Sequence, residues 1–194
     1  MKVSLAIIDD FFPDFNEVRE FALSCDFEQA PKFVDGHNYP RHVEIKDDHF
    51  KSYVASLMTL GMGFGGVQIR HAAFVSAVKG FKTQQWIHAD NICAKFAAVC
   101  HLHNIHGTGT MFFEHHQYGH DMVPPVSEEM AAQLRDDGNK DDANVWRTTD
   151  YAASRCNRLY MFPTERFHGR WPRFSEIEEA EDARLTMVLF FDVH

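Results

Sequence analysis

Long apolar segments and paired cysteines are missing from this sequence of 194 residues. No apolar run approaches the roughly 18 residues that a membrane-spanning helix requires. The opening MKVSLAIIDDFF reaches two aspartates too early for a cleavable signal peptide. The four cysteines contain no C-x-x-C pair, and a chain of this size does not need disulfides to fold. We therefore expect free thiols and a cytoplasmic protein that works away from membranes.

Basic residues are also scarce. Lysine and arginine total 19 against 28 aspartates and glutamates, which gives a net charge of −9 with neutral histidines. A protein that binds the nucleic-acid backbone normally shows a basic face, so this balance argues against a nucleic-acid partner. Hydrophobic residues make up 45% of the chain, including 18 phenylalanines, which excludes a mainly disordered chain. The length suits a single domain, which we expect to span residues 1–194.

Helical patterns dominate the first third of the chain. After a short strand at 4–8, apolar residues recur at helical spacing in 14–24, with Asp14 as a candidate N-cap, and again from about 48 to 60. The stretch 26–47 is typical of loops with one short strand. The following GMGFGG is expected to end the second helix, since no Lys-Ser or Lys-Thr follows to make a phosphate loop. We expect residues 1–66 to form a helical support.

Strand patterns begin at Val67. Segments rich in Val, Phe, Leu and Ile are separated by glycine, proline and charged turns, and lie at 67–78, 93–103, 109–116, 157–163 and 183–191. A polar interval at 117–153 interrupts them, with a helix that begins at Ser127 and an acidic run, DDGNKDD, interpreted as a solvated loop. This order predicts a mainly β protein, a sandwich or barrel over 67–194, with helices packed outside and the interval 117–153 as an insertion and candidate lid.

Histidine is abundant, with 13 residues, and it is the commonest metal ligand in proteins. His88 and Asp90 lie two apart, so in extended chain their side chains point the same way. With one more histidine they would form a 2-His-1-carboxylate facial triad, which leaves open positions on an Fe(II) ion. His168, which follows a predicted strand, is the natural third ligand. An accidental H-x-D pair in a surface turn is the alternative.

The last predicted strand carries a buried charge. Alternation in ARLTMVLFF places Arg184 and Thr186 on one face of a strand that is otherwise apolar on both faces. A guanidinium there costs several kcal/mol unless an anion meets it, and a guanidinium with a hydroxyl two residues on suits a carboxylate ligand. The alternative is a structural ion pair with a core Asp or Glu. Arg170 and Arg173 are weaker candidates for the same role.

Taken in order, His88, Asp90, His168, Arg184 and Thr186 resemble the signature of the Fe(II)/2-oxoglutarate-dependent dioxygenases, especially the prolyl-hydroxylase-like small hydroxylases. The N-terminal IIDDFFPDFNEVREFA and the segments CHLHNIHGTGTMFF and NRLYMFPTERFHG resemble these enzymes too. The spacing from His168 to Arg184 is longer than is usual in that family.

The resemblance implies a jelly-roll (double-stranded β-helix) core. It implies Fe(II) held by the two histidines and Asp90, with no catalytic residue beyond the metal centre. It also implies 2-oxoglutarate with its far carboxylate on Arg184 and Thr186, and O₂ as the oxidant. The implied reaction hydroxylates an unactivated C–H of a small molecule, amino acid or peptide residue and releases succinate and CO₂.

Four further residues are candidates for the substrate pocket. Trp86 and Trp171 flank the proposed ligands, His71 lies on an early strand, and His103 could reach the mouth of the pocket. A cupin-like metal-binding barrel that uses His101, His103 and Glu114 is a different possibility, although Gly107 and Thr108 stand where a cupin would place its carboxylate. We interpret His101, His103, His115 and their histidine neighbours as turn and rim residues, and His42 as a surface residue. A catalytically inactive barrel that acts as a binding module is a third possibility.

Overall fold

The computed structural model describes residues 4–27, 41–77, 86–90, 94–119, 121–122, 127–138, 140, 142–172 and 184–194. Along this part of the chain the elements are β1 (Ala6–Ile8), α1 (Phe15–Leu23), β2 (His42–Glu44), α2 (Asp48–Met62), β3 (Val67–Ala77), β4 (Phe96–His101), β5 (Gly109–His115), α3 (Glu128–Asp137), β6 (Trp146–Ala153), β7 (Leu159–Pro163), β8 (His168–Trp171) and β9 (Arg184–Val193). None of the described helices has the length and apolar composition of a membrane span.

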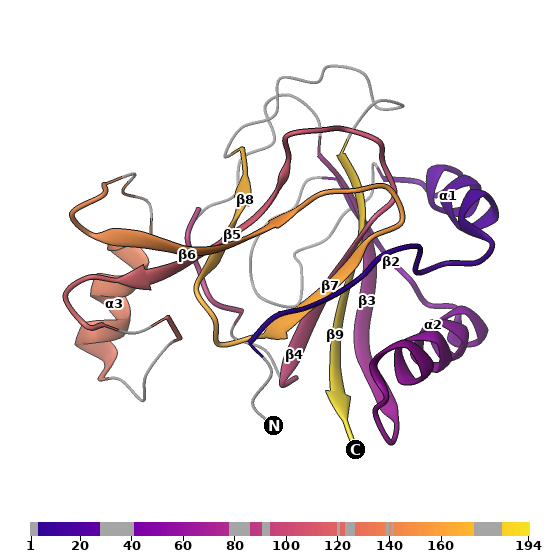
Figure 1. Ribbon diagram of the computed structural model, residues 1–194, viewed down its shortest axis with the longest axis horizontal. Helices are drawn as coiled ribbons and strands as arrows, with labels where there is room; N and C mark the ends of the chain where they lie inside the picture. The colour runs from indigo at the N-terminus through magenta and orange to yellow at the C-terminus, as the bar shows by residue number, and fades with distance from the viewer. Residues whose placement is uncertain are drawn as a thin grey trace.

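Two antiparallel sheets face each other (Figure 1). The larger sheet has the strand order β1-β7-β4-β9-β3-β2, and the smaller one has the order β6-β5-β8. Buried side chains from both sheets meet between them, including Ala97, Tyr160 and Phe190 of the larger sheet and Phe112 and Ala152 of the smaller. The predicted jelly-roll core is therefore confirmed.

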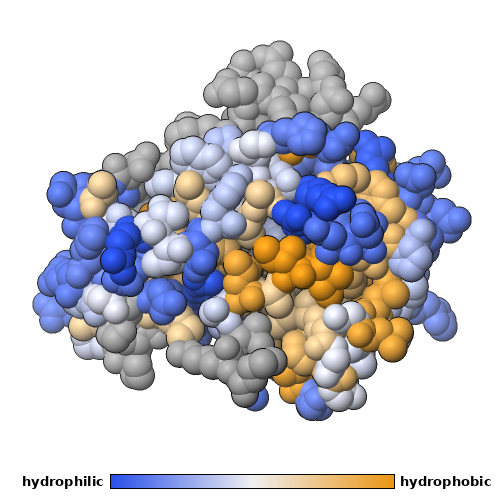
Figure 2. Space-filling model, viewed as in Figure 1, coloured by the Kyte–Doolittle hydropathy of each residue, from blue (hydrophilic) through white to orange (hydrophobic). Residues whose placement is uncertain are grey.

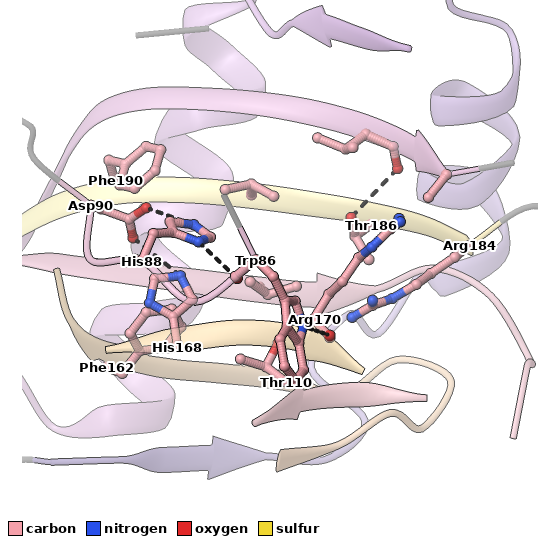
Figure 3. A pocket seen from close by; sticks show the side chains of 15 residues that line it. Trp86, His88, Asp90, Thr110, Phe162, His168, Arg170, Arg184, Thr186 and Phe190 are labelled. Carbon is pink, nitrogen blue, oxygen red and sulfur yellow. Dashed lines mark hydrogen bonds and ion pairs between the residues drawn. The ribbon is translucent and has the colours of Figure 1, made fainter. Parts of the chain in front are cut away.

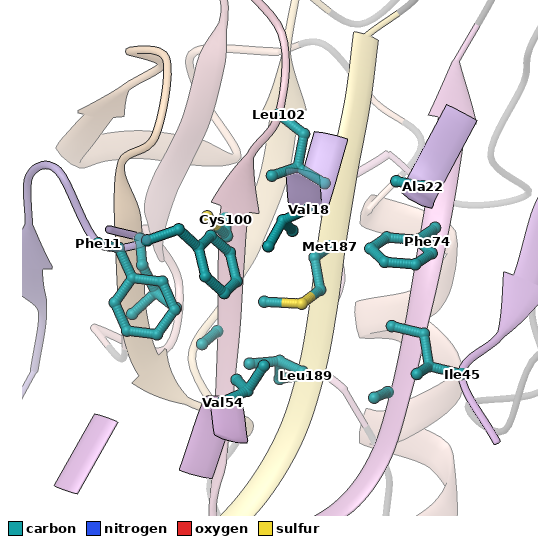
Figure 4. Close-up of a cluster of buried hydrophobic side chains, with 14 of the residues drawn as sticks. Phe11, Val18, Ala22, Ile45, Val54, Phe74, Cys100, Leu102, Met187 and Leu189 are labelled. Carbon is teal, nitrogen blue, oxygen red and sulfur yellow. The ribbon is translucent and has the colours of Figure 1, made fainter. Parts of the chain in front are cut away.

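The N-terminal helices cover the outer face of the larger sheet, as predicted. On β9, Met187 and Leu189 point outward and contact a cluster that includes Val18 of α1 and Val54 of α2 (Figure 4). Val188 and Phe190 on the same strand face the opposite way, toward the smaller sheet. The alternation seen in the sequence thus separates a helix-facing side of the strand from a side that lines the space between the sheets.

The two long N-terminal helices begin in different ways. The Asp47 carboxylate accepts hydrogen bonds from the backbone N–H groups of His49 and Phe50, at 2.8 and 3.1 Å, and so caps α2. Asp14 is the N-cap residue of α1, as predicted, but its side chain makes no capping hydrogen bond and instead accepts one from the Tyr53 hydroxyl at 2.5 Å. That bond ties α1 to α2. Gly63, with φ of 67°, ends α2 in the left-handed conformation that glycine adopts at little cost.

The interval 117–153 contains the predicted helix as α3, which Ser127 caps through the Met130 N–H at 3.3 Å. The last residues of the interval form β6, which pairs with β5, so the excursion returns to the smaller sheet. In Figure 1, α3 lies on the side of the molecule opposite α1 and α2.

Buried polar residues hold α3 in place. His115, interpreted above as a rim residue, is only 2% exposed, and its Nε2 lies 3.2 Å from the Asp137 carboxylate. Asp137 belongs to the acidic run expected to be solvated, yet it is also buried. His42 is buried as well, so these three surface assignments are wrong. Polar side chains that find partners can be buried, which composition alone does not reveal.

Exposed apolar residues gather away from α3. Figure 2 shows them mostly on the side of the molecule that carries β1, α1 and α2, where Ile7, Phe21, Leu23 and Leu60 are exposed. The surface around α3 and the smaller sheet is more polar in this view.

Candidate metal centre

Backbone pairing brings the predicted metal ligands together. The His88 N–H donates to the His168 carbonyl at 2.9 Å and the His168 N–H donates to the His88 carbonyl at 2.8 Å, so the segment 86–90 runs antiparallel beside β8. Directly opposed residues on paired strands project to the same side. Asp90 is fixed by its own N–H, which donates to the Thr164 carbonyl at 2.8 Å.

The three side chains converge on one point (Figure 3). One oxygen of the Asp90 carboxylate lies 3.8 Å from His88 Nε2, and the other lies 3.7 Å from His168 Nε2. One ligand atom of each residue lies within 4.8 Å of the others, and they form the one group of three or more such residues in the described ranges. Asp90 and His168 are each 8% exposed.

Both imidazoles are oriented by backbone carbonyls. His88 Nδ1 lies 3.2 Å from the Trp86 carbonyl oxygen and His168 Nδ1 lies 2.9 Å from the Arg166 carbonyl oxygen. A carbonyl can only accept, so each Nδ1 carries the proton and each Nε2 keeps its lone pair toward Asp90. This is the arrangement that metal-binding histidines show, with the second ring nitrogen bonded to a backbone group. The donor set therefore fits a divalent ion such as Fe(II).

Close contact between β8 and the segment 86–90 requires a glycine. A Cβ on Gly169 would lie 2.6 Å from the Trp86 carbonyl oxygen, which no side chain tolerates. The Trp86 indole N–H donates to the Arg170 carbonyl at 2.9 Å and holds the same two segments together. Phe162 adds an apolar wall, with its ring centroid 4.6 Å from that of His168.

A cavity between the sheets runs from these ligands to Arg184 and Thr186 (Figure 3). We call it the inter-sheet cavity; Trp86, His88, Asp90, His168, Thr110, Arg170, Arg184, Thr186 and Phe190 are among the residues that line it. The lining is mostly apolar apart from its two ends. The five residues of the sequence signature, His88, Asp90, His168, Arg184 and Thr186, therefore line the same cavity.

Arg184 is 9% exposed and lacks a carboxylate partner among the described residues. Its Nη2 donates to the Gly109 carbonyl at 2.8 Å, and its Nε is buried with no acceptor. Burial lowers the pKa of this guanidinium, and the nearby Tyr160 opposes that shift. The structural ion pair considered above is absent from the described part of the chain, where a buried guanidinium is stabilised only if an anion meets it.

Two further polar residues, Thr110 and Tyr160, lie at this end of the cavity, and neither is predicted from the sequence. Thr110 Oγ1 lies 2.5 Å from the Tyr160 hydroxyl, and Tyr160 is fully buried. Thr186 lines the cavity, and its hydroxyl donates to the Val75 carbonyl at 3.4 Å. Tyr160 lies on the face of β7 that points toward Phe112 and Phe190, so the period of two within NRLYMFP was the signal that could have found it.

Of the residues predicted for the substrate pocket, Trp86 lines the cavity and three do not. His71 lies on β3 with Nδ1 3.8 Å from a Glu44 oxygen, Trp171 is 38% exposed at the end of β8, and His103 is buried beyond β4. Their roles in substrate binding stay predictions. Of the alternative arginines, Arg170 lines the cavity and Arg173 lies outside the described residues.

The cupin-like set does not assemble. His101 and His103 contact each other, but Glu114 pairs with Arg147 at 2.7 Å on a different part of the smaller sheet. These three residues form no metal-ligand group in the part of the chain that the structure describes.

Several solved structures share the fold of this chain. AviO1 from Streptomyces viridochromogenes Tue57 aligns with a TM-score of 0.58 and 13% identity over 98% of this chain and 90% of AviO1. HygX from Streptomyces hygroscopicus, solved with nickel, 2-oxoglutarate and hygromycin B bound, aligns with a TM-score of 0.61 and 13% identity over 98% of this chain and 83% of HygX. EctD from S. alaskensis, solved with 2-oxoglutarate and 5-hydroxyectoine, aligns with a TM-score of 0.54 and 11% identity over 97% of this chain and 71% of EctD. The chain thus has the fold of the Fe(II)/2-oxoglutarate-dependent oxygenases, as the sequence resemblance implied.

The chain belongs to the family of unknown function DUF6445, whose model matches residues 1–191. A search of curated protein sequences returned no match.

Proposed function

We propose that this protein is an Fe(II)- and 2-oxoglutarate-dependent oxygenase that hydroxylates an unactivated C–H of a small molecule, amino acid or peptide residue. One observation carries the proposal. The His88, Asp90 and His168 ligand atoms converge at one end of a cavity, and at the other lies a buried Arg184 that has no carboxylate partner among the described residues. A metal site and an anion site in one enclosed space suit a ligand that chelates a metal at one end and carries a carboxylate at the other.

Each end of the cavity has a defined task in this proposal. His88, Asp90 and His168 hold the iron, and the Trp86 and Arg166 carbonyls keep both imidazoles oriented. Arg184, with Thr186 on the same face of β9, binds the far carboxylate of 2-oxoglutarate. The apolar walls exclude water from the space between them. When bound, the iron and 2-oxoglutarate supply the oxidative chemistry with O₂, with succinate and CO₂ as the other products.

The direct test is the weak visible charge-transfer band of an iron–2-oxoglutarate chelate under anaerobic conditions. We expect the wild-type protein to show the band and the His88→Ala and Asp90→Ala variants to lose it. His106→Ala is the matched control, since His106 is exposed and lies outside the cavity. A wild-type protein without the band, or an Asp90→Ala variant that retains it, would refute the assignment.

Turnover of 2-oxoglutarate tests whether the protein is an active enzyme, and turnover with added compounds identifies its substrate. Succinate formation from 2-oxoglutarate without any substrate would separate an active enzyme from an inactive binding module. HygX and EctD were solved with hygromycin B and 5-hydroxyectoine, so small molecules are the first class to screen, followed by amino acids and short peptides. The readout is a mass gain of one oxygen atom in the product.

A further inference from the structure

A fully buried histidine lies beside the arginine end of the cavity. His101 ends β4 directly opposite Thr186 of β9, and its side chain points the same way as those of Ala97 and Val99, which line the cavity. Its ring centroid is 5.4 Å from that of Tyr160, and His101 is 0% exposed. His101 therefore faces the interior of the barrel next to the end of the cavity lined by Arg184 and Thr186, which we call the carboxylate end.

Hydrogen bonds around His101 run in one direction. The Ile105 backbone N–H donates to His103 Nδ1 at 3.0 Å, so His103 Nδ1 accepts and the proton of a neutral His103 is on Nε2. His103 Nε2 lies 3.0 Å from His101 Nδ1 and donates to it. His101 Nδ1 is thus an acceptor too, and His101 carries its proton on Nε2. One backbone N–H fixes the tautomers of two imidazoles.

Both imidazoles are neutral. Burial, and then the nearby positive charge of Arg184, lowers the pKa of His103 to about 3. The same two causes, in the same order, hold the pKa of His101 well below its usual value. A histidine pair with these neighbours keeps its tautomers over the whole physiological pH range.

This chain of donors ends without an acceptor. His101 Nε2 is buried and has no hydrogen-bond partner in the part of the chain that the structure describes, and the same is true of Arg184 Nε. A buried donor without an acceptor costs about 1–3 kcal/mol. Arg184 lines the cavity, and His101, which is not itself among the lining residues, lies next to that end on the cavity-facing side of β4, opposite Thr186. The two donors together therefore indicate a ligand that accepts from both. Carboxylate oxygens meet that need, and the neutral imidazole adds a donor without a second positive charge.

We propose that His101 donates its Nε2–H to the far carboxylate of the 2-oxo acid that Arg184 binds, and that His103 is a positioning residue that fixes the donating tautomer. This inference rests on the proposed function and deepens it. His101 and His103 thus make the cavity selective for a 2-oxo dicarboxylic acid over a 2-oxo monocarboxylic acid. The roles differ, since His101 touches the ligand and His103 acts only through His101.

The test compares two ligands that share the chelating end. 2-Oxopentanoate has a methyl group where 2-oxoglutarate has its far carboxylate, and the charge-transfer band of the anaerobic Fe(II) protein reports the Kd of each. We expect His101→Phe to weaken 2-oxoglutarate binding by about 10- to 100-fold and to leave 2-oxopentanoate binding unchanged, since a hydrogen bond to a charged group is lost from one ligand only. His103→Leu should weaken 2-oxoglutarate binding by less, about 3- to 10-fold. His101→Gln, which restores an N–H donor, should recover part of the loss.

The measurements distinguish a failure of the proposed function from a failure of the inference about His101. If the wild-type protein shows no band with either ligand, the proposed function and this inference both fail. If the wild type shows the band and His101→Phe binds 2-oxoglutarate as tightly as the wild type does, only the inference fails. An equal loss for both ligands also overturns it, because that loss would report a purely structural role.

A second measurement needs no variant. Nitrogen-15 NMR of the histidine rings distinguishes the two neutral tautomers, and we expect Nε2–H for His101 and His103 in the wild-type protein. Addition of 2-oxoglutarate to the protein with a diamagnetic divalent ion should shift the His101 Nε2–H signal, and 2-oxopentanoate should not. A proton on His101 Nδ1, or no difference between the ligands, would contradict the proposal even if the His101→Phe variant failed to fold.

Discussion

The two ends of the inter-sheet cavity are built differently. The metal end consists of the short segment 86–90 paired with β8, and its imidazoles are already held by backbone carbonyls. The carboxylate end consists of side chains from the inner faces of β4, β5, β7 and β9, and it retains buried donors, at His101 and Arg184, that have no acceptor in the described ranges. One end is oriented before its ligand arrives, whereas the other is energetically incomplete without one.

Because of this difference, substitutions at the two ends should change the free energy of unfolding and the affinity for the ligand in different ways. Hydrogen bonds that orient the metal ligands cost the folded protein little, because both partners are satisfied. Buried donors without acceptors lower the stability of the folded protein, and an anionic ligand that satisfies them returns that free energy. Substitutions at the two ends should therefore change the stability of the ligand-free protein by different amounts and in opposite directions.

The largest effect is expected at the metal end. His168→Gln removes one of the three convergent ligand atoms, so we expect stoichiometric Fe(II) or Co(II) binding to be lost, with little change in the apo protein's melting temperature. Metal content after dialysis, measured by elemental analysis, checks this, with His106→Gln as the control at an exposed histidine. A His168→Gln variant that still holds one equivalent of metal would place the metal elsewhere.

Arg184→Met comes next and should separate the two ends most clearly. The buried guanidinium has no carboxylate partner in the part of the chain that the structure describes. Replacing it by an apolar side chain of similar length should raise the free energy of unfolding of the apo protein by about 1–3 kcal/mol. The same change should weaken 2-oxoglutarate binding about 100-fold, since a charge-assisted contact is lost. Thermal unfolding of the apo protein and the band titration measure the two effects. A destabilised variant would show that the Gly109 carbonyl already satisfies Arg184.

The sequence predicts the metal end because its signal is local. His88 and Asp90 are two residues apart, and the period of two in an extended chain makes them converge without knowledge of the fold. The same period of two predicts Arg184 and Thr186, since a charged residue in an otherwise apolar strand can be recognised from that strand alone. The His168 position needed only a strand before it, although β8 itself, with four residues, is too short to produce a pattern.

The rest could not be read from the sequence, because it depends on pairing between distant segments. β6 has five consecutive exposed residues and so resembles a polar loop, and only its pairing with β5 makes it a strand. His101 and His103 look like surface residues until their mutual hydrogen bond shows how both can be buried. Tyr160 and Thr110 meet across the two sheets, a contact that no single strand contains.

A smaller effect follows from the neutral histidine pair. His101 and His103 have lowered pKa values in the folded protein, whereas the pKa of a histidine in the unfolded chain is about 6.5. Below that pH the unfolded state binds more protons, so the free energy of unfolding falls as the pH falls. For His103 the expected loss is about 2 kcal/mol between pH 7 and pH 5, and His101 adds a loss of the same sign. Urea unfolding across this range should show a shallower fall for the double variant His101→Phe/His103→Leu, and parallel curves would contradict the neutral pair.

The smallest expected effects come from two glycines, one at each end. A Cβ at position 169 would lie 2.6 Å from the Trp86 carbonyl oxygen, and one at position 109 would overlap the Ala152 carbonyl oxygen. Gly169→Ala should push β8 away from the segment 86–90 and weaken metal binding about tenfold, since such overlap typically costs about 1–3 kcal/mol. Gly109→Ala should move the carbonyl that holds Arg184 and weaken 2-oxoglutarate binding by a similar factor, with metal binding unchanged.

Gly66→Ala is the control for both glycine variants, because no atom of the described residues lies within 4 Å of the added methyl group. Metal titration and the band titration on all three variants test whether the ends respond independently. Independent responses would mean that the hydrogen bonds between the segment 86–90 and β8 fix the metal site without help from β9. If Gly109→Ala weakened metal binding as much as Gly169→Ala does, the two ends would be one coupled unit, and the contrast between an oriented end and an incomplete end would be wrong.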